Sequence, residues 1–191
     1  MRNLILLGLA LATLPHCRGD QEEALDPAER KSLFLPAVTF IAQELQAIDS
    51  LPVAILRYRS SQGRSDTAIL AKDTFRELME GWFGKPFAEA PTRHPYRRKV
   101  FMDATLGRVT VSCDTDDASA PIQRLDLLLD PETEAIRSLY AERTTAGPEG
   151  TRIRQKLLWS AGRQCRITLE RPGIDTPITE DIRYAWGIGQ P

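Results

Sequence analysis

Few residues in this chain have the types and spacing that catalysis needs. His94 is one of two histidines and lies in a polar segment, 92–95, where a surface position is more common than a catalytic one. The sequence contains neither a Gly-x-Ser-x-Gly turn nor a glycine-rich phosphate loop. Two distant cysteines, Cys113 and Cys165, lack the paired spacing of a zinc site. We therefore predict a non-enzymatic protein without metal or cofactor, and a hydrolase that uses carboxylates alone stays open.

Two charged clusters are candidates for binding rather than catalysis. Residues 114–117, Asp-Thr-Asp-Asp, offer oxygen ligands for Ca²⁺ but lack the glycine and terminal glutamate of an EF-hand loop, so a solvated hairpin turn is favoured. Arg152, Arg154 and Lys156 share one face of a predicted strand and are weak candidates for an anionic lipid or polysaccharide. Arginines on neighbouring strands extend that face: Arg137, Arg166 and Arg183. An ordinary solvent-facing side, balanced by nearby acids, is the favoured interpretation.

The N-terminus is typical of an exported protein. Residues 4–14 form an apolar run of eleven, which fits a secretory signal and is too short to span a bilayer. The run ends in Leu14-Pro15-His16-Cys17, which resembles the bacterial lipobox. That resemblance implies that residues 1–16 are a lipoprotein signal peptide and that Cys17 is lipidated and becomes the first residue. Ordinary cleavage after Ala12 and a buried N-terminal helix are the alternatives.

A short polar segment separates this signal from the main domain. We expect residues 17–25 to be an acidic tether and residues 26–191 to form one α+β domain. The acidic residues just after the cysteine resemble the surface-export signal of Bacteroidota-type lipoproteins. A plain soluble tether without such a signal is an equally favoured interpretation. The 25 basic and 26 acidic residues give a net charge of −1, so the basic excess of a nucleic-acid-binding protein is missing.

Helices and a hairpin are predicted first. Asp26, Pro27 and Glu29 indicate a short helical turn, and Pro36 should interrupt it and begin a second helix that ends near Ile48. That helix carries an apolar stripe with a single acid, Glu44. Further elements are expected in this order: a hairpin of strands 53–60 and 67–71 around a turn at 61–65, a helix with a Thr74–Glu77 capping box, and a proline-rich connector at 84–95.

The remaining chain predicts an antiparallel meander. Alternating residues and short turns indicate strands at 96–103, 108–114, 122–129, 135–143, 152–159, 164–171 and 178–186. Leu127, Ile167 and Tyr184 belong to their apolar faces and should be buried. The fold class is therefore α+β, a large antiparallel β-meander, curved or half-barrel, covered by one or two helices. Three strands lie between those of the two cysteines, so at about 4.8 Å per strand their Cα atoms should be about 19 Å apart in a flat sheet. A disulfide needs less than about 7 Å, so we expect two buried free thiols.

The order of these elements resembles a group of small, uncharacterised outer-membrane lipoproteins common in Bacteroidota. The shared order is lipobox, acidic tether, helix, hairpin, helix, and a long meander that ends in an aromatic-rich strand such as 182–186. The resemblance implies an outer-membrane, lipid-anchored location. We therefore expect a binding or assembly module whose partners are the membrane, through its lipid, and an envelope protein or lipid. The alternative is a carrier that holds a hydrophobic ligand between curved sheet and helices, similar in architecture to lipoprotein-localisation factors.

Overall fold

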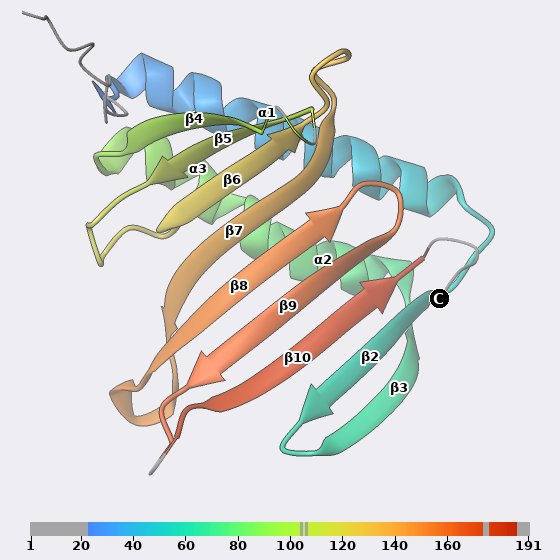
Figure 1. Ribbon diagram of the computed structural model, residues 1–191. Helices are drawn as coiled ribbons and strands as arrows, with labels where there is room; N and C mark the ends of the chain where they lie inside the picture. Colours follow the sequence, from blue (N-terminus) through green and yellow to red (C-terminus); the bar gives the residue numbers. More distant parts are fainter. Residues whose placement is uncertain (1–22, 104, 106, 174–175, 187–191) are drawn as a thin grey trace, which may run out of the picture.

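A computed structural model describes residues 23–103, 105, 107–173 and 176–186 of the chain (Figure 1). Its helices are α1 (Pro27–Ser50), α2 (Lys72–Phe83) and α3 (Lys85–Arg93). Its strands are β1 (Glu23–Ala24), β2 (Ile55–Ser61), β3 (Arg64–Leu70), β4 (Arg97–Asp103), β5 (Arg108–Asp114), β6 (Arg124–Leu129), β7 (Ile136–Ala146), β8 (Arg152–Ser160), β9 (Gln164–Arg171) and β10 (Ile178–Ala185).

The described strands form one antiparallel sheet that stays open. Its order is β1-β4-β5-β6-β7-β8-β9-β10-β2-β3, so β4 to β10 are a meander and the early β2–β3 hairpin pairs with the last strand, β10. The sheet is strongly twisted, and the helices lie together on one of its faces (Figure 1). The expected α+β class with an antiparallel meander is confirmed. We call the helix-covered side of the sheet the inner face and the opposite side the outer face.

Strand positions agree closely with the alternation in the sequence. β5 and β9 have the expected bounds, whereas β7 continues to Ala146. The first hairpin is tighter than expected, because its turn consists only of Gln62 and Gly63, both with positive φ (49° and 74°). Two consecutive left-handed residues make a turn whose twist matches that of the paired strands. The strands therefore extend to Ser61 and resume at Arg64.

Helix α1 begins as expected but does not stop at Pro36. The Asp26 carboxylate accepts hydrogen bonds from the backbone N–H groups of Ala28 and Glu29 (2.7 and 2.9 Å), and the Glu29 carboxylate accepts one from Asp26 N–H. The prediction that Pro36 separates two helices was wrong, because the helix runs through it to Ser50. Proline removes one backbone hydrogen bond, but buried Phe34 and Ala37 on either side hold both halves against the same core.

The segment between β3 and β4 differs most from expectation. Helix α2 begins at Lys72, and its N-cap residue makes no side-chain hydrogen bond, so the predicted capping box at Thr74 was wrong. The Lys72 ammonium instead donates to backbone carbonyls at the end of α1. Residues 85–93, predicted as a connector, form helix α3. Pro86 lies in its first turn, where a missing N–H is harmless, and Phe87 and Ala90 are buried.

Aromatic side chains fill the space between the helices and the inner face. The ring of Phe75 on α2 lies 5.9, 5.3 and 5.5 Å from those of Trp159, Tyr184 and Trp186. The predicted core positions Leu127, Ile167 and Tyr184 are all buried. This packing orients the sheet, because it directs one set of alternating side chains inward and the other set to the outer face.

The two described cysteines are buried and unpaired, as expected. Cys113 lies on β5 and Cys165 on β9, with β6, β7 and β8 between them in the sheet. Since the sheet does not close, its curvature does not bring the two thiols together. Burial raises the pKa of both thiols, that of Cys113 to about 12.

The described chain enters the domain along an edge strand. Glu23 and Ala24, at the end of the segment expected to be a tether, pair with Arg98 and Arg97 of β4. The Leu25 N–H then donates to the Tyr96 carbonyl at 3.1 Å. The predicted signal peptide and lipidated Cys17 lie outside the described residues.

Candidate functional site

The basic residues proposed from the sequence do lie on one face. Arg154 and Lys156 of β8 project from the outer face, and each contacts an acid on a neighbouring strand. The Arg154 guanidinium lies 2.6 Å from Glu142 on β7, and the Lys156 ammonium lies 2.5 Å from Glu170 on β9. Arg152 donates to the Ala118 carbonyl at 3.2 Å. These contacts favour the interpretation of this face as a mixed-charge surface.

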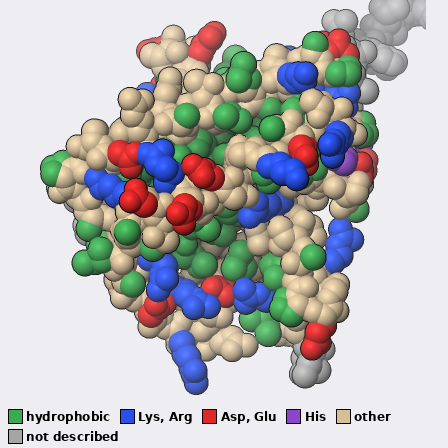
Figure 2. Space-filling model, turned by 180° about the vertical axis from the view of Figure 1, so that it is seen from behind, with side chains coloured by type: hydrophobic (Ala, Val, Ile, Leu, Met, Phe, Trp, Pro, Cys, Tyr) green, Lys and Arg blue, Asp and Glu red, His purple; other side chains and the backbone are tan. Residues whose placement is uncertain are grey.

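Charge pairs continue along the outer face. Arg97 lies 3.4 Å from Asp114 and Arg166 lies 3.0 Å from Asp181, each on a neighbouring strand, whereas Arg124 lies 2.9 Å from Asp126 on the same strand, β6. Arg166 lowers the pKa of Asp181, which keeps that carboxylate ionised. Exposed pairs of this kind contribute little stability each, but they neutralise the field that would attract an anion. Figure 2 shows that the helix side also carries both signs of charge among apolar side chains.

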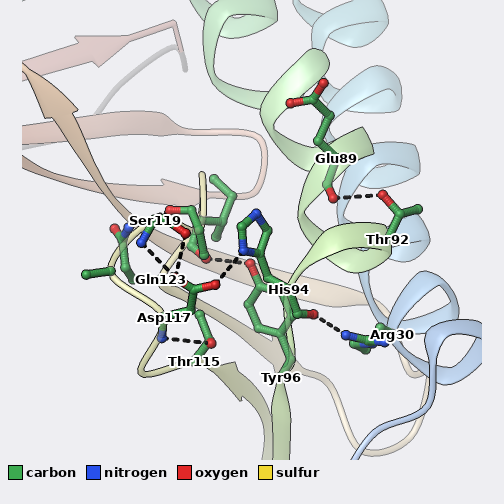
Figure 3. A network of polar contacts seen from close by, with 12 residues as sticks. Arg30, Glu89, Thr92, His94, Tyr96, Thr115, Asp117, Ser119 and Gln123 are labelled. Atoms are coloured by element: carbon green, nitrogen blue, oxygen red, sulfur yellow. Dashed lines mark hydrogen bonds and ion pairs between the residues drawn. The ribbon is translucent and has the colours of Figure 1, made fainter.

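His94 makes a contact that the sequence did not indicate (Figure 3). It caps the end of α3, its Nδ1 lies 2.7 Å from Asp117 Oδ2, and its side chain is only 14% exposed. Arg30 of α1 donates to the His94 backbone carbonyl. The expected surface histidine is thus largely enclosed, and it links α1, α3 and the loop that joins β5 to β6.

This histidine and aspartate do not form a catalytic triad with Ser119. The Ser119 hydroxyl donates to Asp117 Oδ1 at 2.6 Å, whereas a nucleophile must contact the histidine. Hydrogen bonds from Ser119 and then His94 lower the pKa of Asp117 to about 2. Asp114 ends β5, and Asp116 pairs with Arg97, so the acidic cluster is largely neutralised. Within the described ranges no three His, Cys, Asp or Glu side chains gather as metal ligands.

Glu180 is a buried charged side chain on the inner face. Its two carboxylate oxygens accept hydrogen bonds from Arg59 Nε (2.7 Å) and Arg171 Nη1 (3.1 Å). A buried carboxylate that is paired on both sides is a satisfied structural group. We therefore do not assign it a catalytic role.

A pocket of about 670 Å³ opens at one end of the outer face. Residues from three turns and strand ends line it, among them Arg108, Arg137, Arg163, Ser138, Ser160 and Leu128. We call it the arginine pocket. Only Arg137 belonged to the basic surface expected from the sequence. Arg108 and Arg163 were missed because they lie beside separate turns, and isolated turn arginines carry no pattern that marks a site.

Comparison with known proteins gives no assignment for this chain. No family model matches it, and no curated protein matches it either. In the part of the chain that the structure covers, none of the helices combines the length and apolar character needed to cross a membrane.

Proposed function

We propose that this chain is a lipid-anchored envelope protein whose domain is a non-enzymatic binding module. The observation that carries the proposal is the outer face of the sheet. The described helices pack only on the inner face, so a broad side of the sheet and the arginine pocket remain accessible. A concave site of this size, lined by apolar and convergent polar groups, is typical of ligand binding.

The interior supports this function over that of a hydrophobic-ligand carrier. Such a carrier needs space between sheet and helices, where this chain has packed aromatic rings. Phe83 of α2 lies 4.8 Å from Phe87 of α3, and Trp159 lies 5.1 Å from Trp186, both measured between ring centroids. An acyl chain would have to displace these rings from a close-packed core.

The edge of the sheet supports membrane anchoring. Cys17 precedes the first described residue, Glu23, by six residues, which span at most about 20 Å when extended. Glu23 pairs with β4, where Val100, Phe101 and Met102 are 53, 65 and 67% exposed. Because side chains alternate along a strand, Val100 and Met102 project to one side of β4 and Phe101 to the other, so this edge exposes apolar surface on both sides. A lipid on Cys17 would hold this edge close to the bilayer.

Fractionation of cells that express the full chain tests the anchor. The parent should be in the outer-membrane fraction, and mass spectrometry should find acyl chains on its N-terminal peptide. The Cys17→Ser variant should lose both properties, while Cys113→Ala, which removes a buried thiol, should keep them. A Cys17→Ser protein that stays in the membrane fraction would refute lipid anchoring. Native mass spectrometry of the extracted parent then tests the module, since a co-purifying lipid released only on unfolding would favour the carrier.

A further inference from the structure

We propose that the arginine pocket binds the phosphate monoester group of an organic ligand. This inference rests on the proposed function as a binding module and names the ligand class for its outer face. Three arginines line one pocket, and arginine is suited to phosphate because its planar set of donors matches two phosphate oxygens at once.

One arginine is held in place by the protein itself. Nε and Nη2 of Arg137 both donate to Asp130 Oδ2, at 3.1 and 2.6 Å. The other oxygen of Asp130 accepts from the backbone N–H groups of Glu132 and Thr133. Arg137 and these backbone groups hold the pKa of Asp130 well below its usual range, so the contact persists at physiological pH. Arg137 therefore offers its remaining N–H donors from a fixed position.

The other two arginines form no salt bridge with a described residue. Neither Arg108 nor Arg163 pairs with a carboxylate in this way, although Asp103, which is outside the pocket lining, is opposite Arg108 in the β4–β5 register. With Asp130 set against Arg137, the pocket keeps two positive charges. This differs from the centre of the outer face, where Arg154 and Arg166 each lie within 3.0 Å of an acid. An anion in the pocket thus meets a local surplus of charge in a concave site.

The remaining lining specifies the class of ligand. Ser138 and Ser160 are opposite each other on β7 and β8, and their hydroxyls can donate to phosphate oxygens. Leu128 and Ala161 add apolar surface for an organic group. The volume lies within the range of about 300–1,000 Å³ for small-molecule sites, well above the size of one phosphate. A phosphate monoester carries about −1.5 to −2 charge at pH 7, which is opposite to the surplus of arginine over aspartate in the pocket lining.

Binding measurements on the full acylated chain in detergent micelles test this assignment. Glycerol 3-phosphate is the soluble probe, and uncharged glycerol is its control. We expect saturable binding of glycerol 3-phosphate alone, weakened at least tenfold in the Arg108→Gln/Arg163→Gln double variant. Both side chains are exposed, so the double variant should fold as the parent does. Arg154→Gln/Arg166→Gln is the matched control, since it removes two paired outer-face arginines, and its affinity should stay within twofold of the parent.

A second arm distinguishes a soluble ligand from a lipid headgroup. The same proteins are tested for co-sedimentation with phosphatidylcholine vesicles that do or do not contain phosphatidic acid, whose headgroup is a phosphate monoester. Binding to either phosphate source that depends on Arg108 and Arg163 supports the pocket and identifies the source. Binding to neither, or equal loss in the Arg154→Gln/Arg166→Gln variant, overturns it. Such a failure would leave the anchor intact, because the Cys17 fractionation tests that separately.

Discussion

Glu44 is the one acid in the apolar stripe of α1, and its removal should destabilise the whole domain. Its Oε2 accepts hydrogen bonds from the indole Nε1 of Trp159 at 3.0 Å and from the backbone N–H of Gly162 at 2.7 Å. Trp159 is fully buried beneath the helices, so its indole N–H depends on this carboxylate for a partner. The contact ties the middle of α1 to the turn between β8 and β9.

The Glu44→Ala variant leaves a buried N–H without a partner and removes a charged acceptor. An unsatisfied buried group costs about 1–3 kcal/mol, and a hydrogen bond to a charged group contributes about 1.5–3 kcal/mol. Because the two estimates overlap, we expect a loss of about 3 kcal/mol in the free energy of unfolding. For a domain of this size that loss lowers Tm by roughly 6–12 °C. Glu44→Gln keeps an acceptor oxygen and should lose about half as much.

Urea unfolding followed by tryptophan fluorescence measures these differences directly. Gln43→Ala is the matched control, because Gln43 is the exposed neighbour of Glu44 on the same helix, and it should change stability by less than about 0.5 kcal/mol. If Glu44→Ala were as stable as Gln43→Ala, Trp159 would not depend on Glu44. Glu44 would then not be the contact that fixes α1 to the turn between β8 and β9.

Two further predictions concern the core and the loop after β5. Truncation of Leu127 or Ile167 to alanine should lower the free energy of unfolding by about 2–5 kcal/mol, and unchanged urea midpoints would contradict the strand register. Hydrogen bonds to its carboxylate lower the pKa of Asp117 in the folded protein to about 2, whereas an aspartate in the unfolded chain has a pKa of about 4. These bonds therefore stabilise the fold fully above pH 4, and their contribution is lost as the pH falls towards 2. At pH 6 the parent should therefore unfold at a higher urea concentration than Asp117→Asn, and at pH 2 the two should unfold at nearly the same concentration. If the difference were as large at pH 2 as at pH 6, the ionised Asp117 carboxylate would not be the source of the stabilisation.

The meander could be predicted from the sequence because its signals are local. A strand with one buried face alternates apolar and polar residues, and short turns leave no room for crossover helices. The positions of β5 and β9 followed from that pattern alone. The partner of the β2–β3 hairpin could not be predicted in this way, because its pairing with β10 joins segments more than 100 residues apart.

The errors over α1 and α3 have a common physical cause. Pro36 and Pro91 lie inside these helices and are unfavourable there locally, and a sequence pattern registers only that local penalty. Burial of Phe34, Ala37 and Phe87 against the inner face stabilises the helices on the scale of the whole core. The penalty of one missing hydrogen bond is smaller than this packing energy, so α1 and α3 form despite their prolines.

For the functional residues too, the sequence showed the local pattern but not the contacts between distant segments. Arg154 was visible from the sequence because it shares a strand face with two other basic residues, but its acid, Glu142, lies on the next strand. A ligand that binds Arg154 must displace that carboxylate. A ligand that binds Arg108 and Arg163 breaks no salt bridge, because neither arginine forms one with a carboxylate of the described residues, and Asp103 is only the register neighbour of Arg108. On a sheet this rich in charge pairs, the arginines that form no salt bridge, rather than the basic residues that share one strand face, indicate where an anion can bind.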